Sequence, residues 1–267
     1  AYLVASTTVV PIVGRLTDMY GRKWFYIAGI AVFLLGSALA GLSHTMTQLI
    51  IFRGLQGIGG GVMMASAFIA VGDLFPPEER GKNQGLLGGV FGLSSVIGPT
   101  LGGVVTDHLS WHWIFYINLP LGVPVVGLFI AFFPQSRPSG ARQQLDYLGI
   151  ATLVLTVVPL LLALSWGGVQ YEWGSGQVVG LLAFAALAGA VFVATESRVA
   201  DPVIPLSIFR YPVVSVSLLV VFLTGFGMFG GIIFIPLYFQ GVLGTSATNS
   251  GSFLTPMMLG VVAGGII

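Results

Sequence analysis

Apolar runs of about 20 residues recur along the sequence and limit its possible folds more than any other feature. As an α-helix, a run of this length spans the roughly 30 Å hydrocarbon core of a bilayer. Strands that cross a membrane are about half as long and alternate in polarity, which these runs do not. Charged residues make up 7% of the chain, against roughly 25% in soluble domains. The sequence therefore predicts an all-α polytopic membrane protein and excludes a water-soluble globule and a disordered chain.

Hydropathy divides the chain into a series of apolar segments. They cover about residues 1–13, 24–42, 47–71, 85–106, 113–133, 147–166, 177–195, 212–237 and 253–267. The first and the last are too short to cross a bilayer comfortably, because about 13 helical residues reach only about 20 Å. The remaining segments are complete spans. Together with a start at Ala1 inside an apolar run, this pattern predicts an internal fragment of a longer protein.

Basic residues occur in alternate loops only. Arginine and lysine are found in the loops after the first, third, fifth and seventh segments, at Arg15, Arg22, Lys23, Arg80, Lys82, Arg137, Arg142, Arg198 and Arg210. The loops between these contain neither residue type. Because basic residues concentrate in cytoplasmic loops, the loops at 14–23, 72–84, 134–146 and 196–211 are predicted to be cytoplasmic.

The two longest of these loops, 134–146 and 196–211, contain several prolines and charges and are the candidate linkers. They divide the chain into an N-terminal helical bundle at 1–133, a linker region at 134–211 and the start of a second bundle at 212–267. The linker region contains the spans 147–166 and 177–195. This pair is almost free of polar residues within the membrane, so we interpret it as lipid-facing packing.

Arg53 is the one basic residue placed inside a span. A charge at membrane depth costs at least a few kcal/mol unless it faces protein or water, so its default interpretation is functional. At helical spacing it shares one face with Gln56, Gly57, Gly60, Met64 and Phe68, and this face is expected to turn toward other helices or a cavity. The alternative is a structural arginine paired with a carbonyl or an acid. No span contains Asp or Glu, so an acidic partner is expected at a membrane edge or outside this chain.

Two motifs near the N-terminus resemble those of the major facilitator superfamily. Residues 14–23 read GRLTDMYGRK, which is similar to the signature loop between the superfamily's second and third helices and rests on Gly14, Asp18, Gly21, Arg22 and Lys23. Met19 stands where that loop usually carries a basic residue. The alternative is an ordinary basic cytoplasmic loop. The string L-x-x-x-R-x-x-Q-G-x-G, with Leu49, Arg53, Gln56, Gly57 and Gly59, resembles the superfamily's fourth helix.

Two further motifs narrow the resemblance. GLSSVIGPTLGG at 92–103 is similar to the antiporter signature of the fifth helix, carried by Gly98, Pro99, Gly102 and Gly103, with Ser94 in place of its first glycine. Physically, Pro99 is expected to kink or weaken its helix, and the small residues form a face for close helix packing. A static packing seam is the alternative. WHWIFYINLPLG at 111–122 resembles a segment typical of fourteen-span drug–proton antiporters of the EmrB/QacA type.

The resemblance covers the chain from the superfamily's second helix to its tenth, with 147–166 and 177–195 as the two extra central helices. It implies a proton-coupled antiporter of the plasma, or bacterial inner, membrane, which exports hydrophobic or cationic compounds from the cytoplasm by alternating access. In that scheme Arg53, Gln56 and Gly57 form a proton relay, the loop 14–23 is a cytoplasmic latch, and Met64 and Phe68 line the cavity. Export of an endogenous metabolite, or a non-transporting sensor or scaffold on the same fold, are the alternatives.

Other chemistry is not indicated. The sequence has no cysteine, which excludes disulfides and thiolate metal sites. The histidines lie in outer loops without metal-ligand spacing, and no nucleophile–base pair supports an enzyme. The resemblance implies small-molecule substrates and the bilayer as partners, without nucleic acid, metal or cofactor, and with the proton gradient as energy source. Accessory export proteins are left open.

Overall fold

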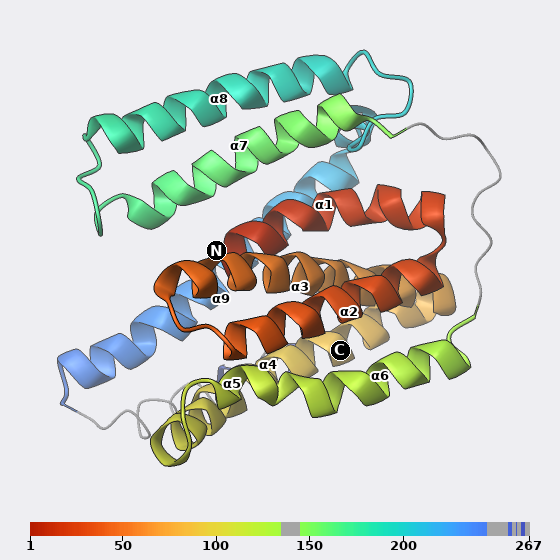
Figure 1. Ribbon diagram of the computed structural model, residues 1–267. Coiled ribbons are helices and arrows are strands. Elements are labelled where there is room, and N and C mark those ends of the chain that lie inside the picture. Colours follow the sequence, from red (N-terminus) through yellow and green to blue (C-terminus); the bar gives the residue numbers. More distant parts are fainter. Residues whose placement is uncertain (135–144, 245–255, 258–259, 261–262, 265–267) are drawn as a thin grey trace. The chain divides into compact units, whose positions relative to one another are not determined.

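The computed structural model describes residues 1–134, 145–244, 256, 257, 260, 263 and 264 (Figure 1). Apart from an isolated bridge between Gly167 and Tyr171, the regular elements in these ranges are helices. They are α1 (Tyr2–Tyr20), α2 (Arg22–Gly41), α3 (Met46–Leu74), α4 (Pro77–His108), α5 (Trp113–Tyr116), α6 (Asn118–Phe132), α7 (Tyr147–Trp166), α8 (Gly176–Glu196), the 3-10 helix η1 (Leu206–Arg210) and α9 (Pro212–Gly241). The all-α prediction is confirmed for this part of the chain.

Six helical segments within the described ranges are long and apolar enough to cross a membrane. They are α2, α3, α5 with α6 (Trp113–Phe132), α7, α8 and the Pro212–Phe239 part of α9. Each corresponds to a span predicted from the sequence. The predicted span 85–106 lies in α4, where the side chains of Ser95, Val96, Pro99 and Thr100 are outside the described residues. Most of 253–267, together with Arg137 and Arg142, is outside them as well.

The predicted end of the first span at residue 13 is wrong, because α1 continues to Tyr20. Hydropathy falls at residue 14, but the backbone stays helical, and the Thr17 hydroxyl donates to the Gly14 carbonyl at 2.8 Å. Only Gly21 separates α1 from α2, with a φ of 83°. This left-handed conformation favours glycine, and the chain turns back at this point in Figure 1.

The predicted span 113–133 is divided into α5 and α6 by Ile117. Pro120 explains the division. It has no N–H to donate to the carbonyl of Tyr116, and its ring would clash with that carbonyl in a continuous helix. Within the first turn of α6, where backbone N–H groups lack helical partners, the same proline is tolerated.

Contacts divide the chain into two compact units. One unit comprises residues 1–66 and 112–206, and the other 67–111 and 207–267. In the first unit α7 lies along α8 and also packs on α1 (Figure 1). A cluster of Ile12, Leu153, Phe192 and Val203 forms the core of this packing. One face of the α7–α8 pair is thus buried. The division of the chain into regions at 134 and 211, predicted from the sequence, stays a prediction.

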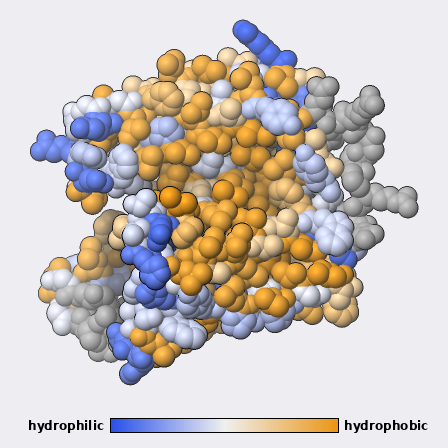
Figure 2. All heavy atoms as spheres, viewed as in Figure 1, coloured by the Kyte–Doolittle hydropathy of each residue, from blue (hydrophilic) through white to orange (hydrophobic). Residues whose placement is uncertain are grey.

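Large apolar side chains lie on the surface of the long helices, and apolar atoms cover much of the face visible in Figure 2. Examples are Leu121 on α6 at 65% exposure, Leu187 on α8 at 65% and Phe226 on α9 at 75%. Monomeric soluble proteins rarely expose contiguous apolar patches of this extent. The distribution is that of helices whose outer surface faces lipid.

Candidate functional site: the polar network around Arg53

Arg53 lies half-buried on α3 and is held by neutral groups. Its Nη1 donates to Oε1 of Gln56, one turn further along the helix, at 2.8 Å. The guanidinium carbon lies 4.5 Å from the ring centre of Tyr2 on α1 and 5.6 Å from that of Phe115 on α5. Both distances suit a cation–π interaction. Among the described residues Arg53 forms no ion pair, so an amide and two aromatic faces stabilise its charge.

Gln56 connects Arg53 to the interior of the unit. Its side chain is 2% exposed, and its Nε2 donates to the Ser37 hydroxyl at 2.9 Å. Because a guanidinium only donates hydrogen bonds, it requires the amide oxygen on its side, and the amide nitrogen then faces the hydroxyl. Both ends of the glutamine amide are therefore satisfied in one orientation.

Ser37 on α2 is the junction of the network and is fully buried. Its Oγ donates to the Phe115 carbonyl at 2.8 Å and accepts hydrogen bonds from Gln56 and, at 3.0 Å, from Nδ2 of Asn118. One donor and two acceptor positions are all that a hydroxyl offers, and this hydroxyl uses each of them. A continuous path of hydrogen bonds thus runs from Arg53 through Gln56 and Ser37 to Asn118, and links α2, α3, α5 and α6.

Close helix approach at glycine makes this geometry possible. A Cβ built on Gly36 would lie 2.5 Å from the backbone nitrogen of Gln56, and one built on Gly57 would collide with the Tyr2 carbonyl oxygen. Real Cβ atoms essentially never come within 3.0 Å of such atoms. Gly57, predicted as part of the relay, therefore brings α1 close enough for the Tyr2 ring to contact Arg53.

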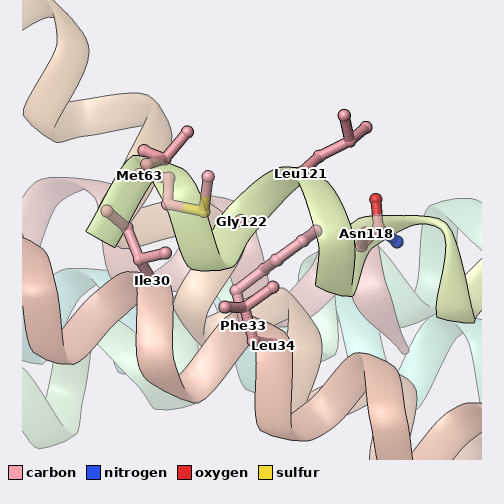
Figure 3. Close-up of a pocket in the computed structure, with 8 residues that line it drawn as sticks. Ile30, Phe33, Leu34, Met63, Asn118, Leu121 and Gly122 are labelled. Atoms are coloured by element: carbon pink, nitrogen blue, oxygen red, sulfur yellow. The ribbon is translucent and has the colours of Figure 1, made fainter. Parts of the chain in front are cut away.

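A shallow pocket adjoins the far end of the network (Figure 3). It has a volume of about 230 Å³, and its lining is apolar except for Asn118. The lining residues come from α2, α3 and α6 and are Ile30, Phe33, Leu34, Met63, Asn118, Leu121, Gly122 and Val125. Met64 and Phe68, predicted to line a cavity, are 55% and 49% exposed and do not border this pocket. Their role stays a prediction.

Comparison with known proteins identifies the family. Residues 1–267 match the family model described as Major Facilitator Superfamily. The chain belongs to the major facilitator superfamily. This is a superfamily of membrane transporters, in agreement with the prediction that the chain is not an enzyme.

Three relatives in this superfamily are similar along nearly the whole chain. The chain is 47% identical over its full length to the multidrug transporter protein MdtP of Bacillus subtilis (strain 168), and covers 49% of that protein. It is 45% identical over its full length to multidrug resistance protein 3 of the same organism, of which it covers 52%. It is 35% identical to the efflux pump FUS6 of Gibberella fujikuroi, with 96% of the chain and 48% of the pump aligned. The chain thus spans about half the length of these curated relatives.

In this superfamily member the predicted latch residues lie at the junction of α1 and α2. Asp18 and Arg22 form an ion pair at 3.3 Å, and both are partly exposed. Lys23 donates to the Ile130 carbonyl near the end of α6 at 2.8 Å. Arg15 instead approaches Asp201, in the segment after α8, at 3.1 Å. Of the two arginines in the predicted latch segment 14–23, Arg22 therefore pairs with Asp18 and Arg15 with Asp201.

The predicted antiporter motif lies in the second half of α4. Gly98, Gly102 and Gly103 have no described atom within 4 Å of the position that a Cβ would occupy. These three glycines therefore have open space beside them in the described part of the chain, whereas Gly92 of the same motif is buried. The side chain of Pro99 is outside that part, so the predicted kink stays a prediction.

Ser37, Asn118 and Tyr2 belong to the network but were not singled out from the sequence. Ser37 is one small polar residue in the apolar segment 24–42. Polar groups at membrane depth require hydrogen-bond partners. This rule would have marked Ser37 and Asn118 as candidates for a hydrogen bond to each other. Tyr2 carries no comparable signal, because an aromatic ring in an apolar span is ordinary.

Proposed function

We propose that this chain is part of a proton-coupled multidrug efflux antiporter of the fourteen-span EmrB/QacA type, which exports hydrophobic or cationic compounds from the cytoplasm by alternating access. Two observations support the proposal. Two relatives that align with the whole of this chain, over about half of their own length, are named multidrug transporter protein and multidrug resistance protein. In addition, α7 and α8 are both long and apolar enough to span a membrane, as the two extra central helices of the proposed fourteen-span arrangement require.

The setting of Arg53 is the observation that carries the proposal of proton coupling. Its positive charge is bound by the Gln56 amide and by aromatic faces, and no carboxylate among the described residues neutralises it. A carboxyl group that approaches this guanidinium in another transport state would be favoured in its ionised form and would release its proton. When that group moves away, it would take up a proton again. Arg53 thereby ties proton release to conformation, with Gln56 and Gly57 fixing its position.

The remaining predicted sites have matching roles in this scheme. Asp18, Arg22 and Lys23 form a cytoplasmic latch, which exchanges partners when the bundles rock. Met64 and Phe68, both about half exposed, offer soft apolar surface to substrates of varied shape. The small residues around Pro99 limit leak along α4. The protein lies in the plasma, or bacterial inner, membrane and uses the proton gradient without a cofactor.

Efflux of a fluorescent lipophilic cation from cells that express the full-length protein tests the proposal. We expect efflux that a protonophore abolishes, and loss of efflux in Arg53→Ala with unchanged protein level in the membrane. Arg198→Ala is the matched control, because Arg198 is exposed outside the helices and should leave efflux intact. Efflux that persists with the protonophore would refute proton coupling.

The same assay separates the alternatives. A protein that exports an endogenous metabolite would leave the dye inside the cell, but in proteoliposomes loaded with that metabolite it would acidify the lumen, because protons enter as the metabolite leaves. A sensor or scaffold would also leave the dye inside the cell, and it would move no protons when the metabolite is supplied. Retention of the dye regardless of the proton gradient would therefore contradict multidrug efflux.

A further inference from the structure

Two buried carboxylates meet where α7 begins and α8 ends. Asp146 is the N-cap of α7 and is 8% exposed. Its Oδ1 accepts a hydrogen bond from the Gly149 backbone N–H at 2.7 Å, whereas its buried Oδ2 has no hydrogen-bond partner. Glu196 is the last residue of α8 and is 3% exposed. Buried polar atoms are nearly always paired, so the unpartnered Oδ2 requires an explanation.

The unpartnered oxygen borders the same glycine as the second carboxylate. A Cβ built on Gly149 would collide with Asp146 Oδ2 and would lie 2.7 Å from Glu196 Oε1. Both oxygens therefore border the same small space, which glycine leaves open. Glu196 also accepts hydrogen bonds from the backbone N–H groups of Val203 at 3.2 Å and Ile204 at 3.3 Å.

No cation among the described residues compensates this pair. Arg15 on α1 forms an ion pair with Asp201, and Arg198 is exposed. Tyr147, the titratable residue next to Asp146, has its side chain 75% exposed. The C-terminal end of α8 adds partial negative charge beside Glu196. Burial and a neighbouring like charge each disfavour the ionised form of a carboxyl group, so a bound proton would lower the cost of burying this pair.

A metal ion does not fit this space. Calcium takes about six to eight oxygen ligands, but Asp146 Oδ1 and both Glu196 oxygens already accept backbone hydrogen bonds. The described residues also contain no group of three potential metal ligands. A proton requires only one oxygen to carry it and one to accept it. The two oxygens beside Gly149 meet that requirement.

We propose that Asp146 and Glu196 together bind one proton, in the space beside Gly149 that Asp146 Oδ2 and Glu196 Oε1 border. The proton joins the beginning of α7 to the end of α8. Through Glu196 it also holds Val203 and Ile204, and both of these residues pack in the cluster with Ile12 of α1. The site is a proton-dependent clamp of the α7–α8 pair on α1. It is independent of Arg53 and of the proposed transport cycle.

The direction of the pH dependence follows from proton linkage. The folded pair holds a proton that two separated, solvated carboxylates release, so the folded state binds more protons than the unfolded state over the titration of the pair. Stability is therefore greatest while the proton is bound, and it falls as the pH rises through that titration. A clamp that depended on two ionised carboxylates would show the opposite trend.

Infrared difference spectroscopy of the purified full-length protein tests the proposal, because spectra recorded between acidic and alkaline pH report the carbonyl stretch of each carboxyl that loses its proton. We expect one band that is absent in both Asp146→Asn and Glu196→Gln. The control Glu172→Gln, at an exposed position between α7 and α8, should retain it. A spectrum that neither substitution changes would overturn the proposal.

Thermal unfolding as a function of pH provides the second measurement. Asn is a good N-cap, and its Nδ2 can donate permanently to Glu196, so Asp146→Asn should fold and lose the decline in stability toward alkaline pH. If Asp146→Asn lowered the unfolding temperature equally at every pH, Asp146 would act only as an N-cap, and the proposed proton site would be overturned. Stability that depends on calcium or sodium instead of pH would also overturn it. Efflux that resists a protonophore would refute the proposed function, but it would not change the pH dependence of unfolding expected here.

Discussion

Gln56 is the nearest hydrogen-bond partner of Arg53, with 2.8 Å between Oε1 and Nη1. In this position an amide and a carboxylate are almost equal in size but differ by a full charge. The amide stabilises the guanidinium without neutralising it, and its other end is committed to Ser37. The positive charge therefore remains available to a group from outside the network. The proposed relay role requires such an available charge, which a structural arginine in a closed ion pair would not offer.

Gln56→Glu should convert the relay into a closed pair. A glutamate would bind Arg53 by a charge-assisted hydrogen bond, which is roughly twice as strong as a neutral one, and would lose the donor to Ser37. We expect normal insertion but at least about tenfold slower proton-coupled efflux, because the arginine charge is already neutralised; a tenfold change corresponds to about 1.4 kcal/mol. Initial rates of dye efflux at equal protein level check this. Unchanged rates would mean that a free charge at Arg53 is not needed.

Ser37→Ala should destabilise the unit far more than its size suggests. The substitution removes one hydroxyl but leaves the Gln56 and Asn118 amides and the Phe115 carbonyl without that partner. An unsatisfied buried polar group costs about 1–3 kcal/mol. Ser43→Ala is a matched control, because Ser43 is equally buried and bonds only to the nearby Ala40 carbonyl. Thermal unfolding in detergent should show a clearly larger loss for Ser37→Ala, and equal losses would argue against a junction role.

Gly57→Ala should disturb the contact between the Tyr2 ring and Arg53 more than the hydrogen bond between Arg53 and Gln56. The new methyl group would collide with the Tyr2 carbonyl, so α1 must shift, and overpacking of this kind costs about 1–3 kcal/mol. Gly54→Ala, one turn earlier, meets no described atom within 4 Å and should be neutral or slightly stabilising, because alanine favours a helix. Unfolding temperatures and efflux rates of the pair check this. If both variants behave alike, the approach of α1 to α3 is not required.

The helices were largely predictable, because membrane-spanning helices appear in the sequence as long apolar runs. The errors occur where hydropathy and hydrogen bonding diverge. Residues 14–20 are polar and were assigned to a loop, yet nothing in them interrupts the helical backbone before Gly21. Conversely, 113–133 is apolar apart from Asn118, yet Pro120 removes the donor that would have joined α5 to α6. Hydropathy measures the environment of side chains, and it does not locate the ends of helices.

The site was predictable only where its residues share a helix. Arg53 and Gln56 are one turn apart, so their proximity follows from helical spacing. Ser37 and Asn118 come from other helices, at separations of 19 and 81 residues from the groups they bond. Such contacts depend on how helices pack, which composition and periodicity do not encode. The resemblance to the superfamily supplied the arrangement of helices but not these particular partners.

Asp18→Asn should test the latch by separating rate from affinity. The Asp18–Arg22 pair is partly exposed, with 47% and 29% of the two side chains accessible, and exposed pairs contribute about 0–1 kcal/mol to stability. Protein level and unfolding temperature should therefore hardly change. If Asp18 exchanges partners as the bundles rock, loss of its charge raises the barrier between states, so the maximal efflux rate should fall several-fold while the substrate concentration at half-maximal rate stays the same. Efflux rates over a range of dye concentrations distinguish the two parameters. A change in apparent affinity at an unchanged maximal rate would place Asp18 in substrate binding and contradict the latch.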